Sequence, residues 1–203
     1  MRILAIETAS EACSVALFED AGLIAHDHRV LGRGHAETLV PMIAALPDKG
    51  RADRILVSLG PGSFTGVRIG IATARALGVA WGAKVLGYPT LALVAAQSDA
   101  SQVTVCMNGG HGEWFVQNFA GGAAQDAVRS LAPEAARDAC LHETIAGNRA
   151  EELAAMFAEA KRPTSLLPDA RKVSVLSEAT FTTDTAPTYG RAPDAVPQKV
   201  AGS

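Results

Sequence analysis

The residues with the most evident chemical potential lie in a glycine-rich loop at residues 60–66, which carries two hydroxyl side chains, Ser63 and Thr65. Glycine adopts backbone angles that other residues resist. Either hydroxyl could cap a following helix, whose free N–H groups and partial positive charge can hold an anion. The loop lacks the lysine of a Walker motif and the third glycine of a dinucleotide motif. Two interpretations stay open: an anion-binding turn, or simply a capped turn between a strand and a helix.

A second pattern occupies the helix predicted at residues 67–81. Small residues recur at every fourth position, and positions four apart share one face of a helix. A glycine inside a helix costs roughly 1 kcal/mol relative to alanine, so several of them need a compensating contact. That contact could be another helix of the same chain or a partner subunit. The small-residue stripe comprises Gly66, Gly70, Ala74, Gly78 and Gly82.

Other groups that could support catalysis are poorly arranged. His26 and His28 are two apart on a predicted strand and so point to one face, but no third ligand is near, and we expect them to face solvent. The remaining histidines are His35, His111 and His142. The odd cysteine count, without a C-x-x-C pair, argues against disulfides, and we expect small buried thiols. The cysteines are Cys13, Cys106 and Cys140. Ser63 lacks a G-x-S-x-G context. We therefore expect no catalytic residues and no metal.

The elements that must position these residues alternate between strands and helices. Apolar runs and turn residues predict strands at 1–6, 13–18, 23–30, 54–59 and 84–87, and helices at 34–46, 67–81 and 89–97. The second half again begins with strand, turn and strand, at 103–108 and 113–119. A helix at 149–161 and an irregular stretch from 180 to 203 follow. Two halves with the same opening indicate two lobes, at residues 1–100 and 101–203.

Composition narrows the class of protein. The chain has 203 residues, 48% of them hydrophobic, and a formal net charge of −3. A free-standing nucleic-acid binder would normally be basic. No apolar run approaches the ~18 residues of a membrane span, and the first residues lack a signal-peptide pattern. We expect a cytoplasmic protein that does not enter a membrane.

Several segments together resemble one family. Residues 60–70, Gly-Pro-Gly-Ser-Phe-Thr-Gly-Val-Arg-Ile-Gly, are similar to the signature of the bacterial TsaB (YeaZ) family. Residues 2–9 and 13–17 resemble its opening strands, and His35 with residues 39–41 resembles its first helix. Residues 186–195 resemble its closing Pro-x-Tyr-x-Arg stretch, although Gly190 replaces the usual large apolar residue, which could loosen the docking of this stretch. The resemblance spans nearly the whole chain and is loose between residues 120 and 180.

This resemblance implies an α/β fold of the actin/sugar-kinase/Hsp70-like (ASKHA) type, with a mixed sheet and helices in each lobe. It also implies a non-catalytic scaffold or activator subunit in the synthesis of threonylcarbamoyladenosine next to the anticodon of tRNA. The implied partners are TsaD, which transfers the threonylcarbamoyl group, and the ATPase TsaE, with tRNA reached through the complex and a homodimer when alone. Pairing through the first two helices is expected. We assign this interface to His35, Leu39, Met42, Ile43, Gly66, Arg68, Ile69, Gly70, Ala74 and Gly78.

The resemblance also bears on nucleotide binding. Actin-type kinases place an acidic residue at the end of the first strand, where Glu7 and Thr8 stand here. The matching strand end of the other lobe usually has Asp-Ala-Arg in the family, but this chain has Asn-Gly-Gly at residues 108–110. We therefore expect no tightly bound cofactor, and ATP or Mg²⁺ only at a shared interface. The vestigial phosphate loop would comprise Glu7, Thr8, Gly60, Gly62, Ser63 and Thr65.

Two other functions are compatible with the sequence. One is an independent ASKHA-type enzyme, such as a small kinase or a peptidase-like protein. The other is a plain dimeric structural protein. The missing second carboxylate and the lack of a His-x-x-x-His pair argue against the enzyme.

Overall fold

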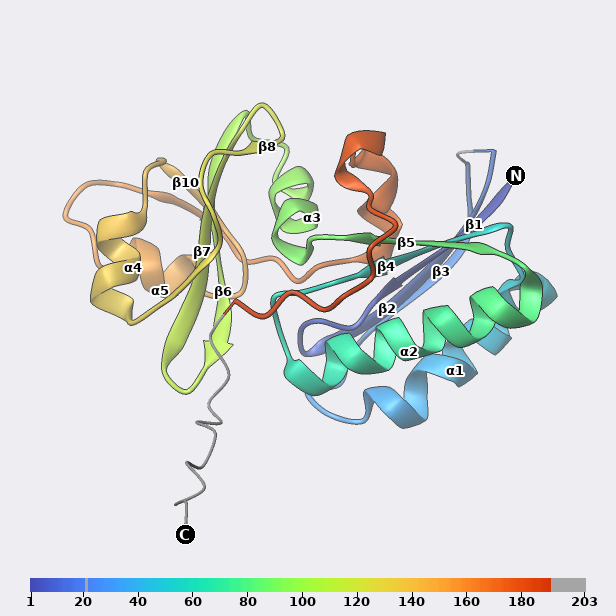
Figure 1. The fold of residues 1–203 in the computed structure, drawn as a ribbon. Helices are drawn as coiled ribbons and strands as arrows, with labels where there is room; N and C mark the ends of the chain where they lie inside the picture. The colour runs from blue at the N-terminus through green and yellow to red at the C-terminus, as the bar shows by residue number, and fades with distance from the viewer. Residues whose placement is uncertain (21, 191–203) are drawn as a thin grey trace, which may run out of the picture.

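Two β-sheets, one in each half of the chain, organise the computed structural model, which describes residues 1–20 and 22–190 (Figure 1). The first sheet has the strand order β3-β2-β1-β4-β5. Its three N-terminal strands form the predicted antiparallel meander, and β4 and β5 then add in parallel. The strands are β1 (Arg2–Glu7), β2 (Ala12–Glu19), β3 (Gly22–Val30), β4 (Arg54–Ser58) and β5 (Lys84–Tyr88).

Helices α1 (His35–Ala45) and α2 (Phe64–Trp81) cover one face of this sheet and lie side by side (Figure 1). Helix α2 starts earlier than predicted, because the Ser63 side chain accepts a hydrogen bond from the backbone N–H of Gly66 and caps it. Gly82, in the left-handed conformation, ends it as expected. A short 3-10 helix, η1 (Pro47–Gly50), follows α1. Apolar side chains of both helices form a buried core with β1, β2 and β4.

The second sheet has the order β11-β10-β6-β7-β8, and β9 pairs with the remaining part of β7. Helix α3 (Thr90–Gln97) packs on one face of this sheet, and α4 (Pro133–Ala139) and α5 (Ala150–Ala154) pack on the other. The strands are β6 (Gln102–Gly110), β7 (Glu113–Ala120), β8 (Ala123–Ala124), β9 (Arg129–Leu131), β10 (Thr144–Ala146) and β11 (Arg162–Thr164). Each half therefore contains a mixed sheet with helices, as the predicted fold class requires.

The helix predicted at 149–161 is wrong in length. Only residues 150–154 are helical, and the backbone N–H groups of Met156 and Phe157 bond three residues back rather than four. Strand β11 pairs in parallel with β10. The chain between them must therefore leave the helix and return to the edge of the sheet where β10 begins. The apolar spacing that predicted a longer helix reflects side chains that remain packed on the core after the helix has ended.

The end of the described chain returns to the first sheet. The 3-10 helix η2 (Ala170–Val175) packs on β1, β2 and β3, and η3 (Glu178–Thr180) follows it. Thr182 forms an isolated antiparallel bridge with Gly87, and the N–H of Thr188 donates to the carbonyl of Leu59 over 2.7 Å. We call residues 178–190 the C-terminal strap. Residues 191–203 of the predicted irregular stretch lie outside the described residues.

Within the described ranges, no helix combines the length and the apolar character needed to cross a bilayer.

Candidate functional site

The small-residue stripe of α2 faces the protein's own sheet. Gly66, Gly70, Ala74 and Gly78 are all buried. A Cβ atom on Gly66 would collide with the carbonyl oxygen of Thr8, and one on Gly70 would collide with the Thr8 hydroxyl. The assignment of this stripe to a partner interface is therefore wrong. The glycines let the helix backbone approach β1 and β5, the same-chain contact that the sequence had left open, although with a sheet rather than a helix.

The residues assigned to the interface on α1 also point inward. Leu39, Met42 and Ile43 are at most 3% exposed and belong to the core under the first sheet. The Nε2 atom of His35 lies 3.2 Å from the carbonyl oxygen of Ala12. This part of the assignment is wrong for the same reason: regular helical spacing identifies one face but does not tell which neighbour covers it.

Of the residues assigned to the interface, only Arg68 and, in part, Ile69 reach the surface. The two helices nevertheless present a different surface on the side away from the sheet. Val40 is 55% exposed and Val79 is 88% exposed, and both helices also carry exposed alanines. We call this surface the α1–α2 face, and it comprises Ala36, Val40, Ala44, Ala72, Ala76 and Val79.

The carboxyl group at the end of β1 is sealed inside the first lobe. Oε1 of Glu7 accepts hydrogen bonds from the Ala9 N–H (2.7 Å) and the Ser58 hydroxyl (2.9 Å). Oε2 lies 3.3 Å from the Tyr88 hydroxyl, whose shorter bond, 2.9 Å, goes to the carbonyl of Ile6. Complete burial raises the pKa of Glu7 to about 7, although these hydrogen bonds oppose the shift. Burial and the adjacent Glu7 also raise the pKa of Tyr88, so its hydroxyl remains a donor.

The vestigial phosphate loop packs against the turn between β1 and β2. The Thr8 hydroxyl donates to the carbonyl of Gly66 (2.8 Å), and the Ser63 N–H donates to the carbonyl of Ala9 (2.7 Å). A Cβ on Gly62 would collide with that same Ala9 carbonyl. The loop residues are thus brought together, and the Thr8 hydroxyl, the Ser63 N–H and the Ser63 hydroxyl all have partners within this packing. The capped-turn interpretation accounts for these contacts, whereas Thr65 is simply an exposed residue of the first helical turn.

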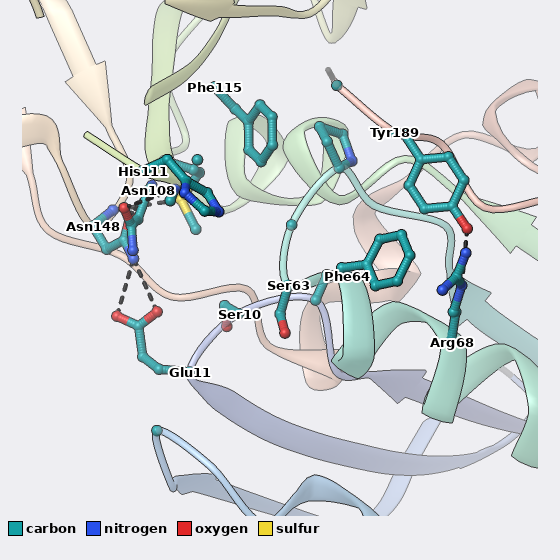
Figure 2. Close-up of a pocket in the computed structure, with 18 residues that line it drawn as sticks. Ser10, Glu11, Ser63, Phe64, Arg68, Asn108, His111, Phe115, Asn148 and Tyr189 are labelled. Carbon is teal, nitrogen blue, oxygen red and sulfur yellow. Dashed lines mark hydrogen bonds between the residues drawn. The ribbon is translucent and has the colours of Figure 1, made fainter. Parts of the chain in front are cut away.

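A cavity of about 540 Å³ lies beside this loop, between the two lobes (Figure 2). Asn148 Nδ2 donates to both carboxylate oxygens of Glu11, each over 3.0 Å, and Asn148 Oδ1 accepts from the N–H of Asn108 over 2.8 Å. The two bonds to Glu11 join the lobes across the cavity, whereas the bond from Asn108 holds the Asn148 side chain in place within the second lobe. Glu7 does not line it, and residues 108–110 supply no carboxylate. The described residues therefore do not offer the pair of carboxylates that would hold a Mg²⁺-bound nucleotide between the lobes.

At the rim of the cavity, three side chains stack together (Figure 2). The guanidinium carbon of Arg68 lies 3.5 Å from the centre of the Phe64 ring, and the Arg68 Nε donates to the Tyr189 hydroxyl over 3.0 Å. The two rings have centroids 5.3 Å apart. No pattern in the sequence indicates the pairing of residues 68 and 189, or that of Glu11 and Asn148.

Gly190 packs closely between the two lobes, although we expected it to loosen the docking of the closing stretch. A Cβ at this position would collide with the ring of Phe115 in the second lobe and would lie 3.1 Å from the Cβ of Pro61 in the first. The absence of a side chain allows the strap to pass between the lobes, so the expectation that Gly190 loosens this stretch is wrong.

The histidines and cysteines remain apart from this region, except that His111 lines the cavity. The His26 ring is exposed, but its Nε2 lies 3.2 Å from a terminal nitrogen of Arg171, and His28 is half-buried. Burial raises the pKa of the Cys13 thiol to about 11, and that of Cys106 is raised as well, so neither favours the reactive thiolate. Among residues 1–20 and 22–190, no group of histidine, cysteine and acidic side chains is arranged to hold a metal ion.

Comparisons with known proteins agree on one family. The model of the family described as "TsaD: tRNA N6-adenosine threonylcarbamoyltransferase" matches residues 29–186. The chain is 42% identical over 100 residues to the tRNA threonylcarbamoyladenosine biosynthesis protein TsaB of Escherichia coli, a match that covers 47% of this chain and only 43% of that protein. An uncharacterized protein of Mycobacterium tuberculosis is 32% identical over 98% of this chain and 95% of its own length.

Solved structures are similar to the whole described fold. YeaZ from Pseudomonas aeruginosa superposes with a TM-score of 0.78 at 26% identity, covering 93% of this chain and 99% of that one. The ethanolamine utilization protein EutJ from Carboxydothermus hydrogenoformans superposes with a TM-score of 0.57 at 9% identity, covering 87% and 90% of the two chains. At that identity the likeness concerns the fold alone.

Proposed function

The chain is a member of the TsaB/YeaZ family, within the TsaD-type family whose model it matches, and on that premise we propose that it serves in threonylcarbamoyladenosine biosynthesis on tRNA. Its role there is that of a non-catalytic scaffold or activator in the cytoplasm. It pairs with a TsaD-type transferase, is joined by a TsaE-type ATPase and reaches tRNA through this complex. By itself it forms a homodimer. The names of its relatives support the pathway, and the surface described above supports the role.

The observation that carries the scaffold role is the α1–α2 face. Val40 and Val79 expose large parts of their side chains on two neighbouring helices, and the other members of the face are alanines. Burying a valine side chain is worth about 1.5–3 kcal/mol, so an uncovered surface of this kind favours association. The pairing through the first two helices is therefore retained, but on the side opposite to the one first assigned.

The interior of the first lobe favours the scaffold over an independent enzyme. The buried carboxyl group of Glu7 has all its contacts within the lobe, and Glu11 is engaged by Asn148. A general base must come within hydrogen-bond reach of its substrate. Neither carboxyl group is free to do so in this arrangement, which supports a role without chemistry of its own.

The test combines reconstitution with a surface variant. The chain is mixed with the TsaD- and TsaE-type proteins of the same organism, tRNA and threonylcarbamoyl-adenylate, and modified adenosine is measured. We expect modification to require this chain and to be lost in Ala76→Trp, which places a large side chain on the α1–α2 face. The matched control is Ala135→Trp, because Ala135 is an exposed alanine on α4 in the other lobe.

Two results would overturn the proposal. Turnover by the chain alone, without the other proteins, would indicate an independent enzyme. Full pairing and full modification with Ala76→Trp would remove the α1–α2 face as the docking surface.

A further inference from the structure

We infer that Arg68 and Arg75 are docking points for two carboxylates on the protein partner that covers the α1–α2 face. This inference rests on the proposed function and adds the chemistry of the partner's surface. It predicts a partner with an apolar patch bordered by acidic side chains.

The first observation concerns the charges on α2. Its 18 residues include no acidic side chain, and Arg68 and Arg75 are its only charged residues. Neither has an ion pair within the described part of the chain, whereas most other arginines there do. A chain with a net charge of −3 thus keeps two cations on this helix without a counter-charge.

The second observation is that both guanidinium groups are held in place by neutral partners. Arg68 stacks on Phe64 and donates from Nε to the Tyr189 hydroxyl. Arg75 donates from Nε to the Thr185 hydroxyl and from Nη2 to the Thr185 carbonyl, each over 3.0 Å. The C-terminal strap supplies both Thr185 and Tyr189. A guanidinium that is already oriented loses less conformational freedom when it binds a carboxylate.

These contacts leave the two terminal nitrogens of the Arg68 guanidinium group without a hydrogen bond among the described residues. Its only hydrogen bond within the described residues uses Nε. Terminal guanidinium nitrogens form the paired N–H donors that suit a carboxylate best. Arg68 can therefore keep its contact with the strap and still bind an acidic group of the partner.

The spacing of the two arginines fits the apolar face between them. Residues seven apart lie two turns along a helix, on nearly the same side and about 10 Å from each other. Ala72 occupies the intervening turn, and Val79 lies one turn beyond Arg75 on the same side. The cations therefore stand in one row with Ala72 and Val79, and charges placed beside an apolar patch select a partner and accelerate its association.

The charges also favour a different protein over a second copy of this chain or RNA. A second copy would bring the same two arginines, with Glu37 as the single acidic residue of α1. RNA phosphates could pair with the arginines but would leave the exposed side chain of Val79 uncovered. An acidic protein surface satisfies both the cations and the apolar patch.

The experiment measures binding of the TsaD-type transferase subunit by titration calorimetry between 50 and 500 mM NaCl. We expect Arg68→Glu/Arg75→Glu to raise the dissociation constant by on the order of 100-fold at low salt and by less at high salt, because salt screens the repulsion that replaces the attraction. The matched control is Arg51→Glu/Arg137→Glu, which makes the same change in net charge at exposed arginines outside α2. Its dissociation constant should stay near that of the parent. Arg68→Ala/Arg75→Ala removes the two positive charges without introducing negative ones. It should also raise the dissociation constant, but by a smaller factor.

Three results would overturn the inference. The first is that Arg68→Glu/Arg75→Glu leaves the dissociation constant and its salt dependence unchanged while Ala76→Trp still abolishes pairing. In that case the proposed function stands, but the arginines do not bind carboxylates of the partner. The second is a defect confined to self-association of the chain. The third is a defect confined to tRNA binding with protein pairing intact. Equal thermal unfolding of the variants and the parent establishes that they are folded, and restoration of pairing by lysines in place of the partner's acidic residues would support the inference directly.

Discussion

Glu7 makes the stability of the first lobe depend on pH in an unusual direction. Its carboxyl group is completely buried, and burial raises its pKa from the usual 4.5 to about 7. Between these two values the unfolded chain has lost a proton that the folded chain retains. The contribution of Glu7 to the free energy of unfolding should therefore be highest below pH 4.5. It should fall as the pH rises toward 7 and level off above pH 7.

The size of the effect follows from the shift. One pKa unit corresponds to 1.36 kcal/mol, so a shift of this size amounts to about 3 kcal/mol between pH 4.5 and pH 7. Glu7→Gln removes the titration with little loss of hydrogen bonding. The amide oxygen can accept from Ala9 and Ser58, and the amide nitrogen can donate to the Tyr88 hydroxyl, which itself donates to the carbonyl of Ile6 over 2.9 Å.

The assay is urea unfolding of the parent and of Glu7→Gln at half-unit steps from pH 5 to pH 8. Subtracting one curve from the other cancels the other titrating groups. We expect the free energy of unfolding of the variant, relative to that of the parent, to rise by about 2–3 kcal/mol across this range and to stop rising near pH 7.5. A difference that does not change with pH would refute the reasoning, because it would mean that Glu7 ionises alike in the folded and unfolded chains.

Three further predictions concern packing and caps. Gly70→Leu should destabilise the fold by more than about 3 kcal/mol in a thermal or urea melt, because the side chain would enter the sheet at Thr8; a stable variant that only loses its partner would contradict this packing. Ser63→Ala should cost about 1 kcal/mol by removing the cap of α2, and an unchanged melting temperature would mean that the cap is not used. Asn148→Ala should increase the distance between spin labels on the two lobes, since it removes the bonds to Glu11, and an unchanged distance distribution would show that the lobes are held elsewhere.

The sequence predicted the elements well where the signal was local. Alternating and continuous apolar runs predicted the strands and main helices of the first sheet, and the two-lobe α/β fold class is confirmed by the architecture and by the likeness to YeaZ. The family resemblance is confirmed as well. Turn glycines marked the hairpin of β6 and β7, where His111 and its neighbours adopt positive φ angles.

The site was predicted less well because its contacts are long-range. The spacing of Gly66, Gly70 and Gly78 correctly indicated a close backbone approach, but spacing alone does not show whether a sheet or a partner comes close. The bond between Glu11 and Asn148 joins residues 137 apart, and no periodicity relates them. Exposed alanines such as Ala72 and Ala76 carry little signal in a sequence, since alanine occupies buried as well as exposed positions of a helix, as the buried Ala74 shows.

The C-terminal strap has a consequence for the order of events during synthesis. The surface around α2 is built from the first hundred residues, yet the groups that orient its arginines, Thr185 and Tyr189, come 110 and 121 positions later than Arg75 and Arg68. A nascent chain can assemble the first sheet early, but it cannot present these cations in their final positions until the ribosome has passed residue 190. Incomplete translation products would thus carry α1 and α2 without the contacts that orient Arg68 and Arg75.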